Sequence, residues 1–425
     1  MRVSIGSGGR VAVIGAGAAG LCSAKNLRDF GSSFKVVVYE RDSELGGTWH
    51  YSEKTGSYSV MYKSLRTNIP KEVMGFPGFP FADGLPSFPG HNDVQTYLES
   101  YATKMDLHPM IRFNIDVQKV WKDESGNSWW VKSSDKMNSE VSVEEFDAVL
   151  VCNGHHGLPV YASVDGLETF TGITTHSSVY RTPTPFRDQT VVLLGYGPSG
   201  VDIAIDIAKG GAKQVLVAHR GYTQDEGSLP NISFRPTLVR VDGSTIHFAD
   251  GRSADADRIV LCTGYAYNFP FLDPRVGVTV KNQVISDLYR HLVFTKDPTL
   301  SFIGIPQKIV PFPLFHYQSI YVTKYLSGEV ELASEEEREN ELHEEWKNHG
   351  DKPDRFFHVF GPRQWEYMYS LAQQTGQTPM PRALQSVFEN ARAVRQDNPL
   401  SYRARQYEVF GDGEADWSCM LVDPI

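Results

Sequence analysis

The hydrophobic and polar positions of this chain follow one order twice. An apolar, β-branched run at 11–14 leads into a glycine turn, a helical stretch beginning near Ala18 and a second apolar run at 36–39. The same order returns between residues 190 and 218. Continuous apolar runs that are joined through helices are typical of buried parallel strands. The pattern therefore predicts an α/β fold with two dinucleotide-binding, Rossmann-like domains.

Each copy contains a glycine loop of the form G-x-G-x-x-G. The first glycine of such a loop permits a tight turn, the second lets the backbone approach a pyrophosphate, and the third lets the helix pack on the strand. The N-terminus of the following helix adds partial positive charge beside the phosphates. We expect the loops to bind two dinucleotides through Gly15, Ala16, Gly17, Ala18, Ala19 and Gly20 in the first copy and Gly195, Tyr196, Gly197, Pro198, Ser199 and Gly200 in the second.

The residue at the end of the second strand distinguishes the two ligands. Glu40 lies 20 residues beyond Gly20, where a carboxylate can accept hydrogen bonds from the ribose hydroxyls. Arg220 lies 20 residues beyond Gly200. A guanidinium there can bind a 2′-phosphate through two hydrogen bonds, whereas a carboxylate would repel it. The first loop is therefore predicted to bind FAD and the second NADPH.

The repeat also predicts how the domains are arranged. Each copy ends in a similar strand, at 147–154 and at 257–264. The apolar segment 300–306 follows the second copy and indicates a return to the first domain. We expect the NADPH-binding domain to be inserted into the FAD-binding domain. The expected bounds are 1–183 for the first part of the FAD-binding domain, 184–294 for the NADPH-binding domain, and 295–425 for the second part of the FAD-binding domain with a C-terminal helical segment.

Composition and charge exclude several classes of protein. The chain has 425 residues, of which 41% are hydrophobic and 22% charged, as in ordinary globular proteins. A formal net charge of −10 argues against a nucleic-acid-binding protein. No apolar run approaches the roughly 18 residues that span a bilayer. The start lacks a secretory signal, so we expect a soluble, cytoplasmic protein, or a secreted one if a signal has been removed. The four cysteines form no C-x-x-C pair, and no metal site is predicted.

Five segments of the chain resemble one protein family. Residues 170–180 match the pattern F-x-G-x-x-x-H-x-x-x-Y, and 44–49, 62–81, 261–265 and 315–334 match further motifs in the family's order. On these motifs the chain resembles the flavin-containing monooxygenases, which are class B flavoprotein monooxygenases, and specifically their soluble type. It is similar to plant and insect members that oxygenate amines or sulfides, with the insect alkaloid N-oxygenases as the nearest group.

The resemblance implies a reaction that uses FAD, NADPH and O2. In this family the reduced flavin forms a C4a-hydroperoxide, which transfers one oxygen atom to a soft nitrogen or sulfur nucleophile. Asn68 matches the polar residue expected beside the flavin and is the candidate catalytic residue; an Asn before Ile-Pro also suits a turn. Tyr62 is a candidate contact of the nicotinamide and Gln318 of the flavin. Further cofactor contacts are expected at Arg41, Leu45, Gly46, Gly47, Trp49, Thr67, Val117, Cys152, Asn153 and Gly154.

Several fingerprint positions have expected structural roles or depart from the family pattern. His176 is expected to lie close to the cofactors. Its expected role is to position the linker and the NADPH domain, and it is not expected to act as a base. Pro198 replaces a usual Asn, and His219 precedes Arg220 where Ser or Thr is common. His316 replaces a frequent acid. The departures in the second loop bear on the preference for NADPH and leave the prediction of FAD binding unchanged.

Two other functions stay open at this point. A Baeyer–Villiger monooxygenase shares both loops, but its fingerprint usually ends in Trp where this chain has Tyr180. A non-oxygenating flavoprotein would bind FAD and oxidise NADPH as an oxidase or redox sensor. A disulfide reductase is excluded because no C-x-x-C follows the first loop. The expected partners are a small amine or sulfide and O2, with no nucleic acid and no membrane; formation of a homo-oligomer is left open.

Overall fold

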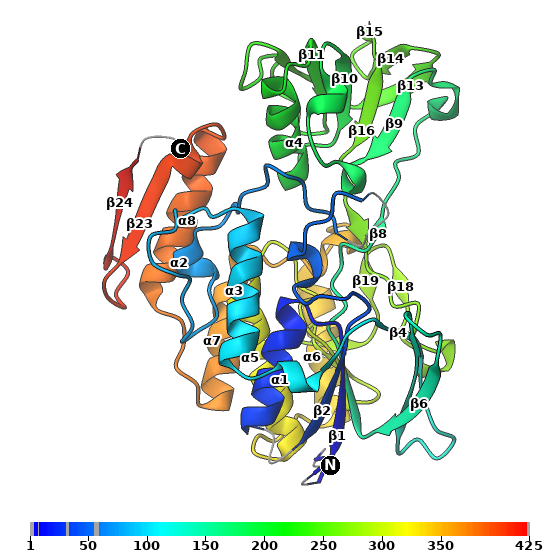
Figure 1. Ribbon diagram of the computed structural model, residues 1–425, viewed down its shortest axis with the longest axis vertical. Helices are drawn as coiled ribbons and strands as arrows, with labels where there is room; N and C mark the ends of the chain where they lie inside the picture. The colour runs from blue at the N-terminus through cyan, green and yellow to red at the C-terminus, as the bar shows by residue number, and fades with distance from the viewer. Residues whose placement is uncertain (1–3, 7, 31–33, 55–58, 423–425) are drawn as a thin grey trace.

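The chain folds into two lobes, each built on a parallel sheet (Figure 1). The structure is a computed structural model that describes residues 4–6, 8–30, 34–54 and 59–422. The larger lobe holds both chain ends and the smaller lobe lies above it in Figure 1. The α/β class expected from the sequence is confirmed.

A seven-stranded sheet forms the centre of the larger lobe. Strands β1, β2, β3, β7 and β22 are parallel, and β21 and β20 are added beyond β22 through two antiparallel pairings. In sheet order the strands are β20 (Leu288–Tyr289), β21 (Val293–Phe294), β22 (Leu300–Phe302), β7 (Ala148–Val151), β1 (Arg10–Ile14), β2 (Lys35–Tyr39) and β3 (Ile111–Arg112).

The two faces of this sheet bury alternate residues of its strands. Val11 and Val13 face a cluster formed by helices, whereas Ala12 and Ile14 face a second cluster beneath a small antiparallel sheet. This alternation is the period of two expected for a strand. The helices are α1 (Ala18–Phe30), α2 (Lys71–Met74), α3 (His91–Lys104), α5 (Pro311–Ser327), α7 (Arg363–Thr375) and α8 (Arg382–Asp397), and the small sheet contains β4 (Ile115–Lys122), β5 (Trp129–Asp135) and β6 (Val141–Phe146).

The smaller lobe contains a five-stranded parallel sheet. In sheet order its strands are β12 (Ile232–Arg235), β11 (Gln214–Ala218), β10 (Thr190–Leu194), β16 (Arg258–Leu261) and β9 (Ile173–His176). Helix α4 (Pro198–Lys209) packs on one face through Ile203, Ala204 and Ile207. The other face is covered by a three-stranded antiparallel sheet of β13 (Leu238–Asp242), β14 (Thr245–Phe248) and β15 (Ser253–Asp255).

The chain crosses between the sheets at places that differ from the expected bounds. Strand β9 at 173–176 pairs with β16 in the five-stranded sheet, although 183 was expected to end the first segment. Strands β20 and β21 pair within the seven-stranded sheet, although 294 was expected to end the second. Each sheet therefore includes edge strands from the segment assigned to the other domain. This is possible because an edge strand can come from a segment outside the βαβ unit that it pairs with. Two further short antiparallel pairs are β8 (Leu158–Pro159) with β17 (Tyr265–Ala266), and β18 (Val280–Lys281) with β19 (Val284–Ile285).

The C-terminal region is helical at first and then ends in a hairpin. Helix α6 (Glu335–His349) is largely exposed, as its acidic sequence predicts, and α8 (Arg382–Asp397) follows α7. A hairpin of β23 (Arg405–Val409) and β24 (Trp417–Leu421) lies beside α8 at the left of Figure 1. The sequence predicted the helices and did not predict this hairpin.

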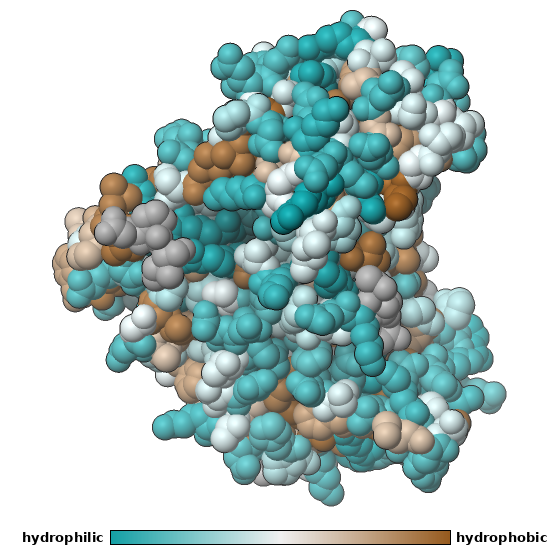
Figure 2. Space-filling view, turned by 45° about the horizontal axis from the view of Figure 1, so that its top comes forward, coloured by the Kyte–Doolittle hydropathy of each residue, from teal (hydrophilic) through white to brown (hydrophobic). Residues whose placement is uncertain are grey.

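The outer surface is mostly hydrophilic. Figure 2 shows hydrophilic residues over most of the face turned to the viewer, with hydrophobic residues in separate patches. None of the helices within the described ranges combines the length and the hydropathy needed to cross a bilayer.

Candidate functional site

The first glycine loop joins β1 to α1 in a geometry that requires glycine at two positions. Gly15 has φ 106°, and its N–H donates to the carbonyl oxygen of Tyr39 at 2.8 Å. A Cβ atom on Gly20 would lie 1.8 Å from the carbonyl oxygen of Gly15, so no side chain fits there. The helix begins at Ala18 with its free N–H groups at the loop. This is the geometry that brings backbone donors to a pyrophosphate.

Glu40 is held against this loop from the end of β2. Its side chain is 6% exposed, and its two carboxylate oxygens accept hydrogen bonds from the N–H groups of Ala16 at 2.8 Å and Asp42 at 2.9 Å. Burial raises the pKa of Glu40, and these two hydrogen bonds oppose the rise. A carboxylate offers about four acceptor positions, so two stay available to ribose hydroxyls.

The segment 44–49 packs directly on the first loop. The N–H of Gly46 donates to the carbonyl oxygen of Ala16 at 3.0 Å, and Gly47 lies against Gly17. The strand end at Cys152 packs on the other side of the loop. A Cβ atom on Gly15 would lie only 2.7 Å from the Cys152 carbonyl oxygen. The fold thus brings together the first loop, Leu45, Gly46, Gly47, Trp49 and the strand end at Cys152, Asn153 and Gly154.

Several buried polar atoms of the larger lobe have no partner within the described ranges, and the side-chain oxygen of Gln95 is the one that lies beside the first loop. Thr48 Oγ1, Tyr51 Oη, Thr67 Oγ1 and Gln95 Oε1 have no hydrogen-bond partner among the described residues. Gln95 donates to the Leu45 carbonyl oxygen at 3.0 Å, which places its free oxygen beside the first loop. An unpaired buried polar atom is costly, so the free oxygen of Gln95 beside the loop suits a ligand that carries hydrogen-bond donors. A dinucleotide such as FAD fits this donor and acceptor set.

Thr48, Tyr51 and Gln95 were not among the residues predicted from the sequence. Thr48 lies inside the 44–49 motif, and membership of that motif could have identified it as a cofactor contact. Gln95 is 50 residues from Leu45 along the chain, and nothing local in the sequence distinguishes it from a solvated helical glutamine.

Asn68 lies in a segment whose backbone is fixed on both sides. The N–H of Thr67 donates to the Pro89 carbonyl oxygen at 2.9 Å, and that of Lys71 donates to the Ser87 carbonyl oxygen at 2.7 Å. Asn68 itself is partly buried, and its amide makes no hydrogen bond to any residue in the described ranges. A fixed backbone with an uncommitted amide can direct hydrogen bonds at a bound molecule.

The second loop repeats the geometry of the first. Gly195 has φ 108°, and a Cβ atom on Gly200 would lie 2.2 Å from the Gly195 carbonyl oxygen. A Cβ atom on Gly197 would meet nothing within 4 Å. Pro198 is the first residue of α4, where a backbone N–H has no acceptor inside the helix. Its departure from the family pattern therefore removes no bond of the helix.

Arg220 follows β11 and is exposed. Its guanidinium forms no ion pair or hydrogen bond with the part of the chain that the structure describes. The neighbouring His219 ring stacks on Tyr196, with ring centroids 5.2 Å apart, and burial lowers the pKa of His219. Arg220 thus occupies the position in the second unit that Glu40 occupies in the first.

Residues of the F-x-G-x-x-x-H-x-x-x-Y pattern hold the segment 170–180 against the smaller lobe. The His176 side chain is 2% exposed, its ring contacts Tyr161 and Tyr265, and its Nδ1 accepts a hydrogen bond from the N–H of Ser178 at 3.1 Å. Burial lowers the pKa of His176. Tyr180 donates to Asp206 of α4 at 2.6 Å.

The remaining predicted residues lie in different surroundings. Tyr62 is buried, and its ring contacts Tyr180 at 5.4 Å. Val117 on β4 is partly buried and packs against the cluster under the small sheet, and Arg41 follows Glu40. Gln318 is fully buried on α5; its amide accepts from the N–H of Gly304 and donates to Tyr367 Oη, both at 2.9 Å. Gln318 is therefore held by partners inside the protein.

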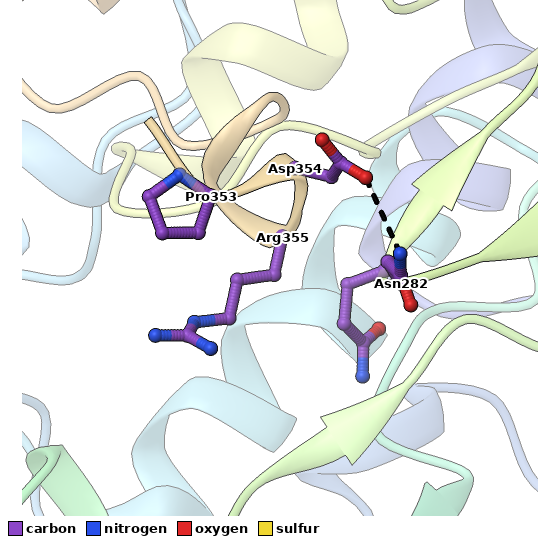
Figure 3. Close-up of a pocket in the computed structure, with 5 residues that line it drawn as sticks. Asn282, Pro353, Asp354 and Arg355 are labelled. Atoms are coloured by element: carbon purple, nitrogen blue, oxygen red, sulfur yellow. Dashed lines mark hydrogen bonds between the residues drawn. The ribbon is translucent and has the colours of Figure 1, made fainter. Parts of the chain in front are cut away.

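A small surface pocket lies apart from all of these residues (Figure 3). It encloses about 280 Å³ between the β18–β19 turn and the segment after α6, with Asn282 donating to Asp354 at 3.2 Å. Its lining is Asn282, Gln283, Pro353, Asp354 and Arg355. Its volume is at the lower end of ligand sites, and we assign it no role in cofactor binding. No group of three His, Cys, Asp or Glu side chains suited to a metal ion occurs within the described ranges.

Comparisons with known proteins agree with this geometry. The family model described as flavin-binding monooxygenase-like matches residues 8–224 and 229–380. The flavin-containing monooxygenase FMO GS-OX-like 4 of Arabidopsis thaliana is 38% identical over 425 residues, covering 92% of this chain and 93% of the relative. The structure of S-allyl-L-cysteine S-oxygenase from Allium sativum superposes with a TM-score of 0.89 at 35% identity, over 94% of this chain and 95% of the other. Tmm from a Pelagibacter species superposes with a TM-score of 0.85 at 25% identity, over 97% and 96%.

The match covers both glycine loops, the fingerprint segment 170–180 and the helices of the larger lobe as far as α7. Members of the matching family use FAD and NADPH, which accords with two nucleotide loops followed by Glu40 and Arg220. This chain therefore belongs to the flavin-containing monooxygenase family, whose members oxygenate nitrogen or sulfur atoms of small molecules.

Proposed function

We propose that this enzyme is an S-oxygenase of small thioethers. The observation that carries the proposal is the likeness to S-allyl-L-cysteine S-oxygenase, which extends over 94% of this chain at 35% identity. The Arabidopsis relatives at 38–40% identity support it, since their names place them in one GS-OX group. N-oxygenation of an amine, for example a tertiary amine alkaloid, is the competing outcome, since the sequence left nitrogen and sulfur substrates both open.

We place FAD on the larger lobe and NADPH on the smaller. Glu40 and the loop at 15–20 would hold the first, and Arg220 and the loop at 195–200 the second. When bound and reduced by NADPH, the flavin supplies activated oxygen from O2 for transfer to sulfur. The chain's own residues orient both nucleotides, exclude water and hold Asn68 in place.

Asn68 is the residue we propose at the reacting centre. Its amide both donates and accepts, so it can bind the flavin edge or the activated oxygen while it accepts from the nicotinamide side. The fixed backbone on either side of Asn68 keeps the direction of these bonds constant. Thr67, with its buried unpaired hydroxyl, would bind the cofactor beside it.

Product analysis with three substrate classes tests the proposal. Purified enzyme with NADPH and air should convert a thioether such as S-allyl-L-cysteine to its sulfoxide. Tertiary amines should react more slowly, and cyclic ketones should stay unchanged. Preferred amine oxidation would replace the S-oxygenase proposal with N-oxygenation, lactone formation would favour a Baeyer–Villiger enzyme, and release of hydrogen peroxide alone would indicate a non-oxygenating oxidase.

Arg220→Ala is expected to weaken NADPH selectively. Loss of hydrogen bonds to the 2′-phosphate should cost about 1.5–3 kcal/mol, which raises KM for NADPH by roughly ten- to hundredfold. NADH lacks that phosphate, so its KM should hardly change. The measurement is a pair of steady-state titrations with the two nucleotides. Arg187→Ala, which removes another exposed arginine of the same lobe, is the matched control. Equal losses for both nucleotides would show that Arg220 does not bind the phosphate.

His176→Gln is expected to leave the pH dependence of kcat/KM unchanged between about pH 6.5 and 8.5. Because burial lowers the pKa of His176, its imidazole is neutral throughout that range and does not titrate there. The substitution should reduce thermal stability or NADPH affinity, since the ring packs between two tyrosines. If a limb of the pH profile disappears in the variant, His176 takes part in proton transfer and the structural role is wrong.

A further inference from the structure

The C-terminal segment reaches back to the residues just before Asn68. Arg403 lies in a short helix at Tyr402–Ala404, more than 330 positions along the chain from Thr67. Its Nε donates to the Thr67 carbonyl oxygen at 3.0 Å, and one terminal nitrogen donates to the Arg66 carbonyl oxygen at 3.2 Å. One guanidinium therefore holds two consecutive carbonyl groups of the segment that leads into Asn68.

The same guanidinium binds the helix that follows the second glycine loop. Its two terminal nitrogens donate to the two carboxylate oxygens of Asp202 on α4, at 3.1 and 2.7 Å. The side chains of Arg403 and Asp202 are only 19% and 12% exposed. A two-point arginine–carboxylate pair fixes orientation as well as distance, and a lysine cannot reproduce it. Arg403 thus connects the C-terminal segment, the Asn68 segment and α4.

Packing holds Arg403 in this position. The Arg403 guanidinium lies 4.7 Å from the ring centre of Tyr402, and that ring packs against Phe88 at 5.1 Å. Immediately afterwards β23 is tied to the same region, since the N–H of Tyr407 donates to Ser87 Oγ at 2.8 Å. Residues 402–407 therefore form a fixed support for the guanidinium.

A second contact joins α4 to the linker one helical turn further on. Asp206 accepts the hydrogen bond from Tyr180, and Tyr180 packs on Tyr62. Asp202 and Asp206 are four residues apart, so they lie on the same side of α4. That side of the helix is therefore linked to the segment that runs from Tyr62 to Asn68 at two points, through Arg403 and through Tyr180.

We infer that Arg403 is a positioning residue that holds the backbone before Asn68 at a fixed place relative to α4, and so couples nucleotide binding at the second loop to the Asn68 side chain. The inference rests on the role proposed above for Asn68. It assigns a function in the reaction to the C-terminal segment, which lies beyond the family match that ends at 380.

The test is a double-mutant cycle of Arg403→Gln and Asp202→Asn. The first readout is the Kd of NADP⁺, measured by fluorescence titration without turnover. Arg403→Gln should raise this Kd about tenfold, because it leaves the Asp202 carboxylate partly buried, unpaired and close to the phosphate-binding end of α4. Asp202→Asn in the same chain should restore part of the affinity. Arg392→Gln, which removes an exposed arginine of α8, is the control.

The second readout is the hydrogen peroxide released per NADPH. Arg403→Gln should raise this fraction severalfold, Arg403→Lys should raise it less, and Arg392→Gln should leave it unchanged. In an Asn68→Ala background, Arg403→Gln should raise the fraction no further, because the two residues act in one pathway. Melting temperature and FAD content show that each variant is folded, and Asp202→Asn and Arg403→Lys supply the test if Arg403→Gln is unstable.

Additive effects on the NADP⁺ Kd across the cycle, with a peroxide fraction equal to that of the Arg392→Gln control, would overturn the inference. A failed S-oxygenase proposal looks different: no sulfoxide would form in any variant, while the coupling between Arg403 and Asp202 in NADP⁺ binding would persist. If the Arg403 variants behave like the Arg392→Gln control while the unmodified enzyme still forms sulfoxide, the positioning role is refuted and the proposed reaction stays intact.

Discussion

Replacing Asn68 with alanine is expected to uncouple NADPH consumption from oxygenation. The amide has no partner among the described residues, so in the proposed role its hydrogen bonds go to the bound nucleotides and the activated oxygen. Losing such a bond in a site shielded from water costs about 1–3 kcal/mol. Expressed as a rate, that is roughly ten- to hundredfold faster loss of hydrogen peroxide. NADPH oxidation should continue while the yield of oxygenated product falls.

Asn68→Asp should uncouple the enzyme further than the alanine variant. A carboxylate at this point disfavours negative charge that develops beside it, whereas alanine is neutral. FAD content should stay near that of the unmodified enzyme in both variants, because Glu40 and the first loop are untouched. Asn92→Ala, an exposed position on α3, is the matched control. Tight coupling in either Asn68 variant would leave Asn68 as a turn residue only.

Gly20→Ala is expected to abolish FAD binding. Its Cβ atom would lie 1.8 Å from the Gly15 carbonyl oxygen, which is a backbone atom that no rotamer change can move. Either α1 shifts away from β1 or the turn at Gly15 opens, and both changes displace the loop N–H groups that we propose bind the pyrophosphate. Overpacking of this kind costs about 1–3 kcal/mol or more. FAD bound per chain should fall below about a tenth, with a lower melting temperature.

Gly197→Ala separates steric strain in the protein from contact with the nucleotide. A Cβ atom there meets nothing within 4 Å, so the fold and the FAD content should be unchanged. Any rise in KM for NADPH then reports a clash with the bound pyrophosphate itself. Full FAD content and an unchanged melting temperature in Gly20→Ala would show that the first loop tolerates a side chain and does not hold FAD as proposed.

The local parts of this structure could be predicted from the sequence. Apolar runs, glycine turns and a charged residue at fixed spacing are properties of neighbouring residues, and they identify both βαβ units, Glu40 and Arg220. The order of the family motifs predicted the family correctly. The structural role expected for His176 stays a prediction; its buried ring contacts Tyr161 and Tyr265 at the end of β9.

Long-range contacts account for what the sequence could not predict. The pairing of β9 with β16 joins segments more than 80 residues apart, so the limits of the two sheets could not be read from local pattern. Gln95 and Arg403 look like ordinary solvated side chains in the sequence, and only the fold brings them to Leu45 and Thr67. The amide of Gln318 likewise pairs with Gly304 and Tyr367, which are distant along the chain.

Isotope labelling tests the central claim most directly. The enzyme is incubated with NADPH, a thioether and ¹⁸O2, and the product is analysed by mass spectrometry alongside NADPH consumption. We predict a sulfoxide that carries one ¹⁸O atom, formed with one NADPH oxidised per product. Unlabelled sulfoxide, or NADPH oxidation in which all of the labelled oxygen ends as hydrogen peroxide, would contradict the assignment of this chain as an NADPH-dependent S-oxygenase.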